Sequence, residues 1–97
     1  MNSTGNRAKY YLIVFNSRNH AYYLESLLKK LRYDCKLLQA PKYLSKSCNV
    51  CLAVYTEEAI KTSLEKIVSS KLDVYKVYEY YYDTTNNKKI YKVIKRG

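Results

Sequence analysis

The sequence predicts one small α+β domain, with two helices packed on a sheet. Its 97 residues can bury one modest hydrophobic core but not two. Apolar residues make up 47% of the chain and occur in short separate runs, none of which approaches the roughly 20 residues of a membrane span. Two stretches have the three- and four-residue apolar spacing of helices, and the other runs are continuous or alternating, as in strands.

The first half of the chain predicts a strand, a helix and two more strands. The run YYLIVF at 10–15 is aromatic and β-branched, which is typical of a central strand. Ser17 is a suitable N-cap for a helix of about four turns. The apolar face of that helix comprises Ala21, Leu24, Leu27, Leu28 and Leu31. The runs DCKLLQ at 34–39 and VCLAVY at 50–55 predict the second and third strands.

The second half predicts a helix followed by two strands. Thr56 is a suitable N-cap, and two glutamates follow it in the first turn. The predicted apolar stripe of this helix is Ile60, Leu64, Ile67 and Val68. A tyrosine-rich strand at 73–82, the turn DTTNNKK and a strand at 90–94 complete the chain.

This order most simply predicts a ferredoxin-like βαββαβ sandwich with an additional C-terminal edge strand. We expect residues 1–9 to form a flexible tail and residues 10–97 to form a single domain. The start of the chain, MNSTGNRAK, has no apolar signal segment, so we expect a cytoplasmic protein with reduced cysteines and no membrane partner.

The net charge of +10 has two interpretations. Residues 1–47 contribute nine basic side chains against two acidic ones, and residues 48–97 contribute nine against six. A basic domain favours anionic partners such as nucleic acid or an acidic protein. However, the sequence is rich in Lys, Asn and Tyr, as in proteins from A+T-rich genomes, so codon bias could also explain the charge.

The most informative segment is APKYLSKSCNVC, residues 40–51. Pro41 has a fixed φ and no amide hydrogen, so it is suited to end a strand and stiffen the loop that follows. Cys48 is expected at the end of this loop, partly exposed. In the predicted topology the start of the first helix lies beside the loop, so Arg18, Lys42 and the helix dipole would favour the Cys48 thiolate. The alternative is a small, unreactive loop cysteine.

The remaining candidate residues are weaker. Cys51 lies in the third strand, where packing is the simpler role, although it could form a dithiol couple with Cys48. Cys35 is also expected to be packed. His20, the only histidine, could serve as a base or hydrogen-bond partner near Cys48 or be an ordinary surface residue. We expect no metal site, because zinc needs four ligands and Cys35 should lie at the far end of its strand.

The tyrosines suggest a different class of function. Those at 78 and 80–82 could stack on single-stranded bases or form a dimer surface, or they could simply pack the sheet. The sequence has no glycine-rich phosphate loop, since Gly5 and Gly97 are its only glycines. We expect no cofactor, and a carrier or binding domain rather than a stand-alone enzyme.

The stretch YYLIVFNSRNHAYYLESLLKKL, followed by CKLLQAPKYLSKSCNVCLAV, resembles a small bacterial family of selenium/sulfur carrier-protein-like domains. The matching positions are Phe15, Ser17, His20, Ala21, Glu25, Leu28, Pro41, Lys42, Ser45, Ser47 and Cys48. The chain departs from the family at Asn49, where the family usually has Gly; Asn is the next best residue for a positive φ.

The resemblance implies a cytosolic domain that holds sulfur or selenium on the Cys48 thiol, as a persulfide or selenosulfide. It also implies a donor protein such as a cysteine desulfurase, and it places His20 and Lys42 near the thiol. Cys51 is an additional thiol that could resolve a persulfide on Cys48. The alternative is a non-catalytic module that binds nucleic acid or protein, or forms a homodimer, through its basic and tyrosine-rich surfaces.

Overall fold

The computed structural model describes residues 10–40 and 50–96. The elements are β1 (Tyr10–Phe15), α1 (Arg18–Lys30), β2 (Cys35–Gln39), β3 (Val50–Val54), α2 (Glu57–Ser69), β4 (Val74–Asp83) and β5 (Lys88–Arg96). Their types and order are those predicted. The largest difference is in β5, which is longer at both ends than the predicted strand at 90–94.

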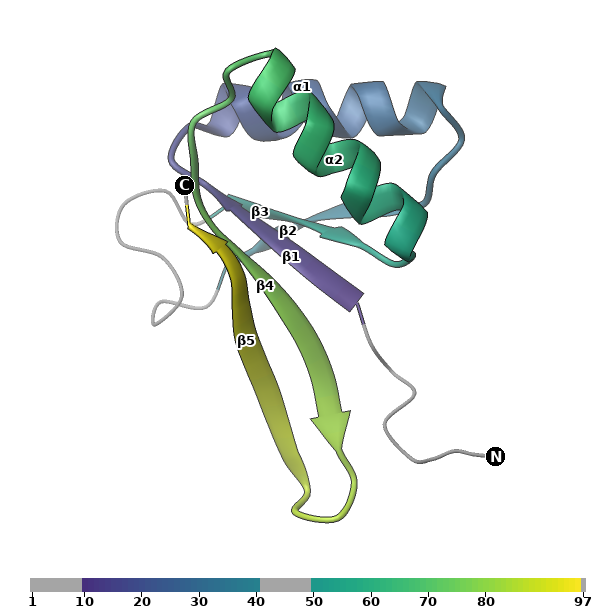
Figure 1. Ribbon diagram of the computed structural model, residues 1–97, viewed down its shortest axis with the longest axis vertical. Coiled ribbons are helices and arrows are strands. Elements are labelled where there is room, and N and C mark those ends of the chain that lie inside the picture. Colours follow the sequence, from purple (N-terminus) through teal and green to yellow (C-terminus); the bar gives the residue numbers. More distant parts are fainter. Residues whose placement is uncertain (1–9, 41–49, 97) are drawn as a thin grey trace.

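The strands form one sheet in the order β2-β3-β1-β4-β5, and every neighbouring pair is antiparallel. Figure 1 shows α1 and α2 on the same side of this sheet. The α+β class is therefore confirmed. Among the described residues, no helix is long and apolar enough to cross a membrane.

The face of the sheet toward the helices carries the main core. Side chains alternate along β1, so Tyr11, Ile13 and Phe15 point to the helices. Leu24 and Leu28 of α1 are fully buried against this layer. The other buried members are Ala21, Leu52, Val54, Ala59, Ile60, Ile67, Val74 and Val77. This core fixes both helices on the sheet and thereby sets where α1 begins.

The opposite face of the sheet has a second cluster, which we call the tyrosine face. Its strand residues include Tyr10, Leu12, Val14, Lys36, Leu38, Cys51, Ala53, Lys76, Tyr78, Tyr80, Tyr82, Lys89, Tyr91 and Val93, and Tyr55 continues it beyond β3. Leu12 and Val14 are buried here although they point away from both helices. Both faces of β1 are therefore apolar, which explains its continuous apolar run.

The β4–β5 hairpin extends past the first residue of β1. β1 pairs with β4 only as far as Tyr10–Tyr80, whereas β4 and β5 pair on to Asp83–Lys88 (Figure 1). In the turn, Asp83 Oδ1 accepts hydrogen bonds from the backbone amides at positions 85 and 86. The hydrogen bond from the Asn86 side chain, together with these amide bonds, lowers the pKa of Asp83.

Two predicted core positions are wrong. Leu31 follows the last turn of α1 as its C-cap and is 47% exposed. Val68 is 68% exposed, and Ser63 occupies the buried side of α2 instead. The Ser63 hydroxyl donates to the Ala59 carbonyl at 2.7 Å, which satisfies its hydrogen-bonding need inside the core. A serine that bonds to its own helix can thus replace an apolar residue in the stripe.

Candidate functional site

A surface pocket of about 330 Å³ lies where α1 begins and the β2–β3 connection leaves the sheet. Its described lining residues are Arg18, Tyr22, Leu37, Leu38, Gln39 and Val50. Gln39 ends β2 and Val50 begins β3, so both ends of the connection meet the first turn of α1. The prediction that α1 begins beside the segment 41–49 concerns residues outside the described part of the chain; the residues that flank this segment, Gln39 and Val50, do line the same pocket as Arg18.

Most of the predicted site residues belong to the connection itself. Pro41, Lys42, Ser45, Ser47, Cys48 and Asn49 lie outside the described residues, and their roles stay predictions. Among the predicted site residues that are described, Arg18 lines the pocket. His20 and Cys51 have other surroundings.

The N-terminus of α1 carries the partial positive charge of its first-turn amides. Ser17 is its N-cap, but the Ser17 hydroxyl accepts no hydrogen bond from the first-turn amides, and the first turn holds no acidic residue. The capping bond that Ser17 was expected to make is therefore not formed. Because Arg18 adds a full positive charge to the partial positive charge of the helix start, this end of the pocket favours an anion.

His20 is held on the other side of the helix start. Its Nδ1 accepts a hydrogen bond of 2.8 Å from the Asp73 amide, just before β4. Asn16 secures the same residue: its side chain donates to Asp73 Oδ1 at 2.9 Å, and its amide donates to the Asp73 carbonyl at 3.0 Å. The bond to Nδ1 places the ring proton of a neutral His20 on Nε2.

Asn16 and Asp73 were missed from the sequence. They are 57 residues apart, and neither belongs to a motif that would have paired them. Together with His20 they tie the β1–α1 turn to the start of β4. His20 therefore has a structural role that the sequence did not predict, and Arg18, two residues earlier, projects from a different side of the helix.

Cys51 lies in the middle of the sheet and is 1% exposed. It pairs with Leu38 on one side and with Val14 on the other, on the tyrosine face. The predicted packing of Cys51 in its strand, on the same face as Ala53, is confirmed. A residue this buried would need the sheet to open before its sulfur could meet a protein partner.

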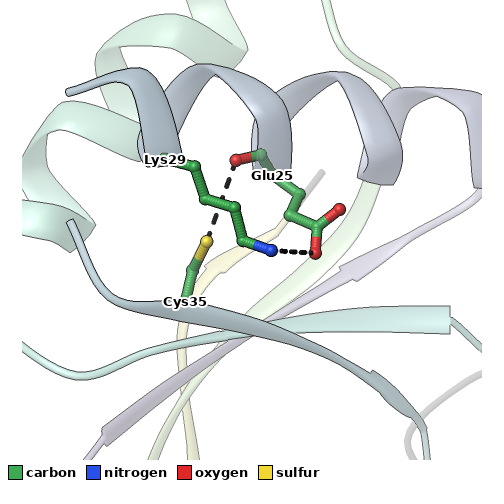
Figure 2. Close-up of polar contacts among 3 residues, drawn as sticks. All are labelled: Glu25, Lys29 and Cys35. Atoms are coloured by element: carbon green, nitrogen blue, oxygen red, sulfur yellow. Dashed lines mark hydrogen bonds and ion pairs between the residues drawn. The ribbon is translucent and has the colours of Figure 1, made fainter. Parts of the chain in front are cut away.

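Cys35 lies at the opposite end of β2 from the pocket. Figure 2 shows its sulfur directed to α1, where it donates to the Glu25 carbonyl at 3.9 Å, and the Lys29 Nζ lies 3.2 Å from Glu25 Oε2. Burial raises the pKa of the Cys35 thiol, the negative charge of Glu25 raises it further, and Lys29 partly offsets this. A raised pKa leaves less of the Cys35 thiol in the thiolate form, which is the nucleophilic one.

Cys35 packs against the main core, as expected, but it is only partly buried. It begins an edge strand, where one side of the residue has no neighbouring strand in the described part of the chain. Residues 10–40 and 50–96 contain no group of three His, Cys, Asp or Glu side chains that could hold a metal ion.

Comparison with known proteins adds one finding. Residues 10–79 match the model of the family described as "Putative Se/S carrier protein-like". No curated protein and no solved structure matches the chain. The match covers most of the chain, from β1 into β4, and includes the whole rim around the pocket. The family indicated by the sequence is confirmed: the chain belongs to the Se/S carrier protein-like family.

Proposed function

We propose that this protein carries sulfur or selenium on the thiol of Cys48, which it loads from a donor protein such as a cysteine desulfurase in the cytoplasm. Membership of the Se/S carrier protein-like family supports the type of cargo. The observation that carries the proposal is the pocket at the start of α1, because both ends of the Cys48 segment border it.

The position of Cys48 in the chain supports its proposed place near this pocket. Cys48 precedes the lining residue Val50 by two positions, and two residues of chain span at most about 7 Å. Arg18 lines this pocket and is also the first residue of α1, so its side-chain charge and the helix N-terminus act on the same side of the pocket. An anionic sulfur held there would be stabilised by both, whether it is the thiolate that attacks or the persulfide that results.

The loading step is a thiol exchange. The Cys48 thiolate attacks the outer sulfur of a donor persulfide, forms a new S–S bond and breaks the donor's S–S bond. The donor cysteine leaves as a thiolate, and the proton of the outer sulfur stays with that sulfur. No external oxidant or reductant is needed. A selenium atom in the outer position would follow the same course and leave a selenosulfide on Cys48.

The other residues of the segment have supporting roles in this proposal. Pro41 stiffens the segment as it leaves β2, and Asn49 allows a turn just after the thiol. Lys42, Ser45 and Ser47 supply a charge and hydroxyls that can hold the loaded sulfur. His20 supports the site through its hold on Asp73, which fixes the start of α1, and Cys51 acts as a second thiol only when β3 opens.

The fold assignment belongs to the same proposal. We assign the domain, residues 10–97, to the ferredoxin-like class with β5 as an added edge strand and residues 1–9 as a tail. The order β2-β3-β1-β4 with two helices on one side supports this assignment. In such an arrangement the rim where β1 ends also holds the β2–β3 connection, which is why helix dipole and thiol can meet.

The experiment is persulfide transfer followed by peptide mass spectrometry. The full chain is incubated with a cysteine desulfurase and L-cysteine, alkylated under native conditions and digested. We expect one added sulfur on the peptide with Cys48, and none after Cys48→Ser. Cys35→Ser and Cys51→Ser are matched controls and should load normally. Equal loading of the Cys48→Ser chain, or loading on Cys35 instead, would overturn the proposal.

A further inference from the structure

We propose that the tyrosine face, completed by the β4–β5 hairpin, binds single-stranded nucleic acid. The proposal is independent of the chemistry at Cys48. It begins with a row of four rings that crosses the sheet. Ring centroids lie 5.7 Å apart for Tyr55 and Tyr10, 4.5 Å for Tyr10 and Tyr80, and 5.1 Å for Tyr80 and Tyr91.

The row follows from the register of the strands. Tyr10 of β1 pairs with Tyr80 of β4, and Tyr80 pairs with Tyr91 of β5. Tyr55 continues the row on the residue after β3. Neighbouring strands lie about 4.8 Å apart, so the register sets one ring beside the next across the sheet.

Three of the four rings in the row remain at least partly exposed. Tyr55 is 42% exposed, and Tyr10 and Tyr91 are partly exposed, while Tyr80 at 8% is packed between its neighbours. The inner ring therefore supports the outer ones. Aromatic rings set on a sheet in this way form a platform on which unpaired bases stack, whatever their sequence.

The charge of this face fits a polyanion. Lys36 lies beside Ala53, Lys76 beside Val14 and Lys89 beside Tyr82, all on the tyrosine face. The strand positions assigned to this face in residues 10–40 and 50–96 include no Asp or Glu. In β4, Glu79 pairs with Tyr11 on the helix side. Phosphates passing over the strand positions of this face would thus meet lysines, while Asp34, which precedes β2, continues the register beside Tyr55 at one end of the row.

These features disfavour other occupants. A second copy of this chain would bring the same lysines face to face, at a net charge of +10 for each copy. An acidic protein would satisfy the lysines, but it has no particular need for four aligned rings. Single-stranded nucleic acid uses both features, because its phosphates and its bases alternate along one strand.

The family match does not supply this surface. It ends at residue 79, while Tyr80, Tyr82, Lys89 and Tyr91 lie beyond it. Half of the ring row and one of the three lysines therefore come from the part of the chain outside the match. The hairpin that projects past β1 in Figure 1 enlarges the face on this side.

The test measures binding of a fluorescent oligouridine to the full chain by anisotropy at several salt concentrations. The face variant Lys36→Gln/Lys89→Gln is compared with the control Lys61→Gln/Lys92→Gln, whose lysines are exposed on α2 and on the helix side of β5. Both variants lose the same charge. Loss of two phosphate contacts should reduce the salt slope by about 1.4 in the face variant alone.

Stacking is tested with a second pair of variants. Tyr55→Ala should weaken oligouridine binding about fivefold or more, whereas Tyr23→Ala, of similar exposure on α1, should have no effect. Cys48→Ser should bind normally, which separates this proposal from the carrier function. Equal losses in the face and control variants would overturn it. The proposal would also be overturned if the chain bound duplex RNA more tightly than oligouridine. It would equally be overturned if polyglutamate competed with oligouridine while Tyr55→Ala left binding unchanged.

Discussion

The two faces of the sheet are closed by different means. On the helix side, aliphatic residues such as Ile13 and Val77 pack against leucines and isoleucines of α1 and α2. On the other side, Leu12 and Val14 belong to a cluster that includes tyrosines of β1, β4 and β5. Leu12 and Ile13 are thus both buried although they are adjacent in β1. The helices cover Ile13, whereas Leu12 is covered by a cluster that includes partly exposed tyrosine rings.

This difference separates stability from recognition. The helix side fixes the start of α1 at the pocket, because its buried residues hold both helices in place. The tyrosine face keeps Tyr55, Lys36 and Lys89 exposed while its inner residues are buried. One sheet can thus hold the proposed thiol site at its rim and a separate binding surface on its second face.

The largest effect is expected from two adjacent substitutions in β1. Ile13→Ala removes a fully buried side chain beneath the helices and should cost about 4 kcal/mol of unfolding free energy. Leu12→Ala should cost about 2 kcal/mol, because the Tyr78 ring in register with it can move into the space. Urea unfolding of both variants measures the difference. If the two losses are equal, the tyrosine face is packed as rigidly as the main core.

A smaller effect is expected at the helix starts. The Thr56 hydroxyl accepts a hydrogen bond of 3.1 Å from the Ala59 amide, so Thr56→Ala should cost about 1 kcal/mol. Ser17 makes no such bond, and Ser17→Ala should cost only a few tenths of a kcal/mol. The two variants are compared by urea unfolding. A loss at Ser17 as large as that at Thr56 would show that the start of α1 is capped after all.

The sequence predicted the elements because their periodicity is local. Continuous apolar runs and three- and four-residue spacing identified all seven in order, and the glutamates after Thr56 marked the start of α2. The faces of β4 were harder to predict. Its register with β1 shifts near Tyr75, between the pairs made by Val14 and Phe15. Simple alternation along the strand fails at such a bulge.

The candidate site was predictable in part, for a related reason. The approach of α1 to the ends of the β2–β3 connection follows from the order of elements and crossover handedness. The contact between His20 and Asp73 does not, because it joins positions 53 residues apart through a backbone amide. The ring row was hidden as well: thirteen tyrosines gave no indication of which four would align until the register was known.

The smallest effect is a difference in alkaline pH dependence between the faces. Burial raises the pKa of Cys35 on the helix side, with a further rise from Glu25. Burial also raises the pKa of Tyr10 on the tyrosine face, followed by Tyr80, Tyr55 and Cys51. Because both groups hold their protons more tightly when folded, their contribution to stability is complete below the unfolded pKa values and is lost as pH rises through the folded ones.

The unfolding free energy should therefore decline from about pH 8.5, where an unfolded cysteine titrates, and again from about pH 10 for tyrosine. Cys35→Ser should reduce the first decline and keep a donor for the Glu25 carbonyl, while Tyr10→Phe should reduce the second and keep the ring row. Urea midpoints measured across this pH range test both. Curves parallel to that of the unmodified chain would mean that neither group titrates differently in the folded state, and that the two faces do not differ in this respect.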